Sequence, residues 1–212
     1  ATGVPHITLG VNIFADGSHL PTILIFPSKT LPSEINLATM DDYLDSSIAG
    51  QDSGWMTAKL LEEYCKETII PEYKKRLSPL GPNARGLFIL DGHSSRANPD
   101  LLETFSAANV DVVTFVSHTS HVCQPLDLVI FGTFKSQLTK ANLSFRKASS
   151  SEKRRSLVTS ALRCLHAALY PADVKTAFTK AGIWPLDRTP VLSNKFVRDA
   201  LQPSPVAESS PR

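Results

Sequence analysis

The chain has 212 residues, of which 42% are hydrophobic and 20% are charged, and its formal net charge is +2. This composition is typical of a globular protein with one sizeable core and argues against a disordered or fibrous chain. No apolar run approaches the roughly 18 residues of a membrane-spanning helix, and the first residues lack the layout of a signal peptide, so we expect an intracellular protein that does not bind membranes.

The first predicted elements are two β-rich segments, residues 7–14 and 20–26, which flank an Asp-Gly pair at positions 16 and 17. Asp-Gly between two such segments is a strong hairpin signal, because Gly adopts a positive φ at little cost. We therefore interpret Asp16 as a turn residue and not as a catalytic acid. Pro21, near the start of the second segment, suits an edge strand.

A helix is predicted from about Trp55 to Ile70, after residues 28–52, which show no sustained periodicity and are interpreted as a loop with at most a short helical turn. Apolar residues recur at a four-residue spacing along one face of this helix. We expect residues 52–54 to cap it and Trp55 to lie in the core, since a buried Trp is commoner than one that stacks on a nucleic-acid base.

A strand–helix–strand unit follows, with a short apolar strand at residues 87–90, a helix at 99–108 and a β-rich run at 112–116. Such a unit builds a parallel sheet with a right-handed crossover. Asp91 then lies at the carboxyl end of the first strand, where open α/β sheets place their ligands. An acid at this position could also start an Asx-turn. A nucleotide-binding domain is disfavoured, because residues 90–93 contain one glycine where phosphate-binding loops need several.

A second acid, Asp127, lies in the first turn of a helix predicted for residues 125–140. The helix dipole favours a negative charge there, so position alone leaves two interpretations, a functional acid or a helix cap. Upstream, His118, His121 and Cys123 could form a metal clip. Soft ligands do not suit hard divalent ions, and we interpret this segment instead as shaping the loop before the helix.

Basic residues concentrate after this point. The segment from Lys135 to Arg163 has eight bases and one acid. It could bind the phosphate backbone of DNA, or it could be a solvated helix face and loop. Helices are predicted for residues 151–169 and 174–187, and the prolines and serines after Asp199 indicate a disordered end.

Two segments together carry a resemblance to a known family. LDGHSS at residues 90–95 and SHTSHVCQPLDLVIFGTFK at residues 117–135 resemble the catalytic core of the pogo/Tigger-like branch of the mariner superfamily, the DDE superfamily endonuclease domain. The resemblance implies an RNase H-like α/β fold, a mixed sheet flanked by helices. In it, Asp91 and Asp127 look like the second and third acids of a three-acid site that binds Mg²⁺ or Mn²⁺. It further implies a nuclear protein that binds DNA, and it leaves a homo-oligomer open.

The same resemblance predicts what this chain lacks. The family's first acid sits on the first strand of the domain, upstream of the hairpin, whereas this chain opens directly before the hairpin. We therefore expect an N-terminally truncated core (residues 1–195) without its central strand, a hairpin poorly paired with the strand at 87–90, and a disordered Pro/Ser tail (residues 196–212).

Whether this chain is an enzyme is open at this point. It is either a fragment of a DDE transposase or endonuclease domain, whose intact family cleaves and transfers DNA strands with a divalent metal, or a domesticated or decayed remnant that binds DNA or protein without catalysis. Two acids without the third bind metal weakly, so for this chain alone we favour inactivity.

Overall fold

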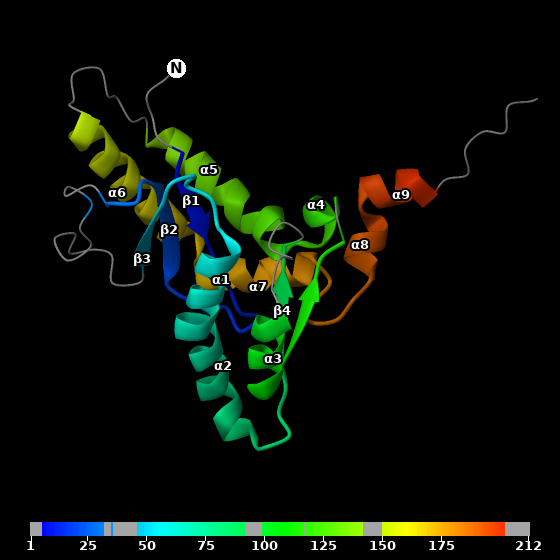
Figure 1. Cartoon of the computed structure of the whole chain (residues 1–212). Coiled ribbons are helices and arrows are strands. Elements are labelled where there is room, and N and C mark those ends of the chain that lie inside the picture. Colours follow the sequence, from blue (N-terminus) through cyan, green and yellow to red (C-terminus); the bar gives the residue numbers. More distant parts are fainter. Residues whose placement is uncertain are drawn as a thin grey trace, which may run out of the picture.

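The computed structural model of the protein describes residues 6–31, 35, 46–91, 99–116, 118–141 and 150–201. Its strands are β1 (Thr8–Gly10), β2 (Thr22–Pro27), β3 (Ser46–Gln51), β4 (Gly86–Leu90) and β5 (Val110–Thr114). Its α-helices are α1 (Ala58–Tyr64), α2 (Ile70–Leu77), α3 (Pro99–Ala107), α4 (Ser120–Cys123), α5 (Phe131–Lys140), α6 (Ser150–Ala168), α7 (Pro171–Lys180), α8 (Thr189–Ser193) and α9 (Lys195–Leu201). The protein is thus a mixed α/β structure (Figure 1). No helix in these ranges is both long and apolar enough to cross a membrane.

The predicted hairpin is confirmed. β1 and β2 pair antiparallel, with Thr8 opposite Ile25. In the turn, the carboxylate of Asp16 accepts hydrogen bonds from the backbone N–H of Ser18 at 2.8 Å and from its hydroxyl at 2.6 Å. Gly17 has φ +99°, a conformation that residues with a Cβ rarely adopt. Asp16 is therefore a turn residue, as the Asp-Gly signal predicted.

The position of β2 differs from the prediction. β3 pairs with β2 in parallel register, so β2 is the middle strand of its sheet and not an edge strand. Pro21 is tolerated because pairing begins one residue later, at Thr22, so its missing N–H interrupts no ladder hydrogen bond. β3 itself lies in the segment that we interpreted as a loop. Its sequence has no β-branched alternation, and it is stabilised by pairing along the whole of β2.

The helix after β3 begins later and extends further than predicted. Thr57 caps it, its hydroxyl accepting a hydrogen bond from the N–H of Leu60, and residues 52–54 lie outside it. A π-helical turn over Cys65–Ile69 joins α1 to α2. Pro71, the second residue of α2, follows this turn after Ile70 and has no N–H to donate, so it cannot continue a regular ladder. Trp55 precedes the helix and is 60% exposed against the ring of His6, so the expectation that it lies in the core is wrong.

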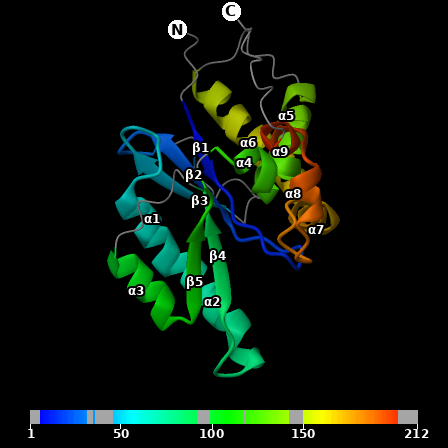
Figure 2. The same cartoon turned by 90° about the vertical axis from the view of Figure 1, so that its right-hand side faces the viewer.

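Helices cover both faces of the strand layer. Ile23 and Ile25 of β2 point into a cluster built with α1, α2 and α3, whereas Leu24 and Phe26 pack on the other side against Val158 and Leu162 of α6. A third cluster joins α6, α7 and the segment before α5. Figure 2 shows the strands between α1–α3 on one side and α5–α7 on the other. This alternation of inward faces is the three-layer arrangement expected of an α/β domain.

The strands of the described residues fall into two sheets, β1–β2–β3 and β4–β5. The predicted strand–helix–strand unit is confirmed, with β4 and β5 parallel and α3 between them, although β5 begins two residues before the predicted strand. As expected, the hairpin does not pair with β4. One hydrophobic cluster nevertheless contains residues of both sheets, among them Ile25, Phe88 and Val110, so the same helical layer covers both.

Candidate functional site

Asp91 directly follows β4. Leu90, the last residue of β4, pairs with Thr114 of β5, and its carbonyl oxygen accepts a hydrogen bond from the N–H of Phe115 at 3.0 Å. The side chain of Leu90 is 7% exposed, so core packing and sheet pairing together fix the end of the strand. Asp91 is half-buried and leaves the carboxyl end of a parallel strand pair, as predicted.

Asp127 lies in a second π-helical turn, Leu126–Ile130, which leads into α5. The carbonyl of Gln124 accepts hydrogen bonds from the N–H groups of both Asp127 and Leu128, at 3.1 Å each. Ile130, at the end of the turn, is fully buried against α6 and α7. Because Ile130 is anchored in the core, Asp127 lies on the exposed side of the turn. Single π turns inside helices recur at functional sites, because they re-aim side chains that a regular helix would place elsewhere.

The negative charge of Asp91 acts on the carboxyl group of Asp127. The pKa of Asp127 is raised, first because the surrounding protein removes part of the water around its carboxyl group and second because of the negative charge of Asp91. The positive charges of Lys135 and His121 act in the opposite direction. The fold therefore brings Asp91 and Asp127, which are far apart in the sequence, within electrostatic range of one another.

The donors at this place suit a hard divalent cation. Carboxylate oxygens are the ligands that Mg²⁺ and Mn²⁺ prefer, and a cation between two such groups would relieve their repulsion. Beside Asp127, the side chain of Gln124 is 7% exposed, and its oxygen Oε1 has no hydrogen-bond partner among the described residues. Buried polar atoms normally have a partner, so this oxygen is a hydrogen-bond acceptor left without one in the described part of the chain, three residues before Asp127.

Sequence reasoning did not predict that the charges of Lys135 and His121 act on Asp127, or that the side-chain oxygen of Gln124 lacks a partner within the described ranges. A usable signal existed for Lys135, which lies two turns after Asp127 on the same predicted helix. The clip considered for His118, His121 and Cys123 is not supported. Across the described ranges, no group of three or more His, Cys, Asp or Glu side chains could hold a metal ion.

The basic block maps to α5 and α6, which lie side by side in both views (Figures 1 and 2). Lys135 and Lys140 are exposed on α5, and Arg155 is exposed on α6. Residues 142–149, which include two further bases of the block, lie outside the described residues. The exposed bases leave both interpretations of the block open, but among its described bases Lys135 is the one whose charge acts on the carboxyl group of Asp127.

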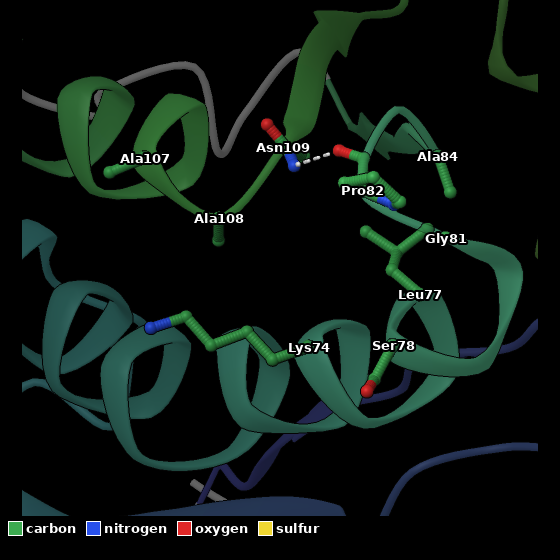
Figure 3. Close-up of a pocket in the computed structure, with 9 residues that line it drawn as sticks. All are labelled: Lys74, Leu77, Ser78, Gly81, Pro82, Ala84, Ala107, Ala108 and Asn109. Carbon is green, nitrogen blue, oxygen red and sulfur yellow. Dashed lines mark hydrogen bonds between the residues drawn. The ribbon is translucent and has the colours of Figure 1, made fainter.

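A separate pocket of about 440 Å³ lies between the end of α2 and the start of β5. Lys74 and Leu77 line one wall, Ala108 and Asn109 line another, and the amide of Asn109 donates a hydrogen bond to the carbonyl of Pro82 (Figure 3). Its residues precede β4 and β5, so the pocket lies at the opposite end of these strands from Asp91. It contains no carboxylate and does not belong to the acid site.

Comparison with known proteins places the chain in a class of endonucleases. It matches the DDE superfamily endonuclease family over residues 6–178. The match covers most of the chain, which therefore belongs to this family, and the family expected from its sequence motifs is confirmed.

Two known proteins share parts of the sequence. The chain is 26% identical over 167 residues to the MFS-type transporter clz9 of Cochliobolus lunatus, covering 73% of this chain and 16% of that protein. It is 25% identical over 125 residues to the Pogo transposable element with KRAB domain of Homo sapiens, covering 59% of this chain and 19% of that protein. The chain thus spans less than a fifth of either relative. No solved structure matches it.

Proposed function

We propose that this chain is the part of a DDE endonuclease core that carries two acids of its metal site, Asp91 and Asp127, and that it acts on DNA in the nucleus. One observation carries the proposal. Two carboxylates from separate elements lie near enough that the charge of Asp91 raises the pKa of Asp127. Holding two acids together costs free energy, and such pairs concentrate at functional sites.

The metal we propose is Mg²⁺ or Mn²⁺. In the two-metal chemistry of nucleases, bound ions activate the attacking water or hydroxyl and stabilise the leaving oxygen. Asp91 and Asp127 would hold and orient the ions. Lys135, whose charge already acts on Asp127, would attract a substrate phosphate to the same side. The family membership and the similarity to a pogo element support DNA as the substrate.

The RNase H-like architecture is part of this proposal. One helical layer covers both sheets, yet no described strand joins β1 to β4. A strand between these two edges would complete a single mixed sheet. In the family that this chain resembles, such a strand carries the first acid, beside the carboxyl end of β4. We propose that a complete site needs this third acid.

Taken alone, the chain is proposed to bind metal and DNA without efficient cleavage. Within the described residues, no group of three acids, histidines or cysteines surrounds a common point. Two carboxylates hold a divalent ion weakly, because Mg²⁺ then depends on water and substrate for its other ligands. Weak metal binding of this kind is our reason to propose, for the chain in isolation, the alternative function of a remnant that binds DNA or protein without catalysis.

Metal binding is tested by following thermal unfolding of the purified chain while Mn²⁺ is added, for wild type, Asp91→Asn, Asp127→Asn and the control Asp111→Asn. Asp111 lies on β5 opposite Leu87, four residues or about 13 Å back along the strands from Asp91. A ligand that binds only the folded state raises its Tm. Mn²⁺ should therefore raise the Tm of wild type and Asp111→Asn but not that of the other two variants.

An equal Mn²⁺ response in all four proteins would contradict the metal site. A plasmid-nicking assay in Mn²⁺ separates the two functions. We expect no nicking by this chain. Nicking that disappears in both Asp91→Ala and Asp127→Ala would instead show that the two acids suffice for catalysis.

A further inference from the structure

The carboxyl-terminal helix α9 lies within the segment that the sequence predicted to be a disordered tail. It is capped by Asn194, whose side-chain oxygen accepts a hydrogen bond from the N–H of Phe196 at 3.0 Å and whose carbonyl accepts one from Arg198 at 2.9 Å. A capped first turn explains why these residues are helical. The rest of the predicted tail, after Leu201, lies outside the described residues.

A ring contact joins α9 to the acid site. The rings of Phe196 and His121 meet edge to face with their centroids 4.7 Å apart, within the range favoured for aromatic pairs. His121 lies on α4, the short helix that leads into the turn of Asp127, and its charge reaches the carboxyl group of Asp127. Both views show α8 and α9 beside α4 (Figures 1 and 2). The contact therefore places α9 against α4, beside a residue whose charge acts on Asp127.

The α8–α9 segment contributes little to the core. None of the hydrophobic clusters in the described chain contains one of its residues. Phe196 remains 64% exposed despite its contact with His121, and Leu201 is 69% exposed. This short helical pair stabilises the core little, and it exposes an aromatic ring beside a candidate site. Both are features of a binding surface.

The charge of this segment fits a polyanion. Residues 188–201 contain three bases, Arg188, Lys195 and Arg198, and one acid, Asp199. All three bases are exposed. Lys195 and Arg198 are three residues apart on α9, so their side chains project from the same face of the helix. Exposed bases next to an exposed aromatic ring are the combination with which proteins hold a nucleic-acid strand.

We infer that α9 is a DNA-contacting element, in which Lys195 and Arg198 bind phosphates of the strand that passes the acid pair and Phe196 fixes the helix to His121. The inference rests on the proposed function and extends it. Lys135 of α5 lies near Asp127 as well, so the strand would run from α5 across the two acids to α9. The occupant proposed for α9 is the DNA backbone, because residues 188–201 carry three bases and one acid.

The test measures the salt dependence of binding to a fluorescent DNA duplex of arbitrary sequence, using the full chain and fluorescence anisotropy. The variants are Lys195→Gln/Arg198→Gln, Phe196→Ala, Lys135→Gln/Lys140→Gln, and the control Lys74→Gln/Lys75→Gln on α2. The control removes the same number of charges at a place remote from α9 (Figure 1). Each lost phosphate contact lowers the slope of log affinity against log salt by about 0.9.

We expect the α9 double variant to lose about 1.8 from this slope and at least about tenfold in affinity near 0.1 M salt. Phe196→Ala should weaken binding in the same direction, with an unchanged circular dichroism spectrum, and the α2 control should bind like wild type.

Equal binding by the α9 variants and the control, with a loss only in the α5 variant, would overturn the inference and leave the proposed function standing. No DNA binding by the wild type would refute the proposed function itself. A change in oligomeric state at unchanged DNA affinity would show that α9 is an interface between copies, and would also overturn the inference.

Discussion

Single residues decide how well the loops of this fold are held to its core, and Tyr64 is the clearest case. Its hydroxyl donates a hydrogen bond to the carbonyl of Pro21 at 2.8 Å and accepts one from the amide of Asn12 at 3.1 Å. Tyr64 is 6% exposed and both partners are half-buried, so removing the hydroxyl leaves two partly buried polar groups each short of a partner. Tyr64 thereby ties both ends of the loop between β1 and β2 to α1.

Replacing Tyr64 with Phe should lower the free energy of unfolding by about 1–3 kcal/mol, the range for leaving buried polar groups without a partner. Urea unfolding measures the difference. The matched control is Tyr170→Phe, since Tyr170 is 64% exposed and its substitution should change stability by no more than about 0.5 kcal/mol. Equal effects of the two substitutions would show that the Tyr64 hydroxyl contributes nothing.

At the level of elements, the end of α7 depends on one glycine. Gly182 has φ +68°, and its carbonyl accepts a hydrogen bond from the N–H of Asp187 at 3.0 Å, which closes the loop that follows the helix. A Cβ at position 182 would collide with the backbone carbonyl oxygen of Asp187. Any other residue there meets both backbone strain and backbone overlap.

Gly182→Ala should therefore destabilise the protein by about 2–4 kcal/mol, as strained backbone positions do. Gly132→Ala is the control, and we expect it to change the stability of the protein in the opposite direction. Gly132 lies in α5, and no atom of the described residues outside its own helix turn lies within 4 Å of the place that a Cβ would take, so alanine there should stabilise the protein by about 0.5–1 kcal/mol. Thermal unfolding shows whether the Tm of each variant rises or falls relative to wild type. A Gly182→Ala variant more stable than wild type would refute this explanation of the loop.

Elements with a local signal could be predicted from the sequence. The Asp-Gly turn specified the hairpin, and a short apolar run ending in Asp91 specified β4 and the place of that acid. β3 could not be found in this way, because its pairing with β2 and not its own pattern makes it a strand. The π turn that contains Asp127 likewise depends on distant segments, because its last residue, Ile130, is buried against α6 and α7. α9 was missed because it is only seven residues long, too short for a helical period to stand out, and it is followed by a segment rich in prolines and serines.

For the whole molecule, one cluster is decisive because it is shared by both sheets. It contains Ile25 of β2 and Phe88 of β4 together with three ionisable residues, Tyr64, Cys65 and Tyr73. Burial raises the pKa of each of these three groups to about 12. Each is neutral when protonated, so the folded state holds its proton more tightly than the unfolded state does.

The sign of the pH dependence follows from this difference. Below about pH 8, one unit under the ordinary pKa of the thiol, all three groups are protonated in both states and stability is unaffected. As pH rises from there to about 12, the unfolded state releases these protons first, and stability falls by about 1.4 kcal/mol per unit of pKa difference for each group. Because the cluster joins both sheets, we expect the loss to unfold them together.

Urea unfolding near pH 8 and near pH 11, followed by hydrogen exchange of the Ile25 and Val110 amides, tests this whole-molecule prediction. The midpoint should fall at the higher pH, and the two amides, one in each sheet, should exchange with the same free energy of opening. Tyr64→Phe should make the pH dependence shallower, since it removes one of the three groups. Persistent protection of one sheet while the other exchanges freely would show that each sheet keeps its own core, and that the shared cluster does not couple them.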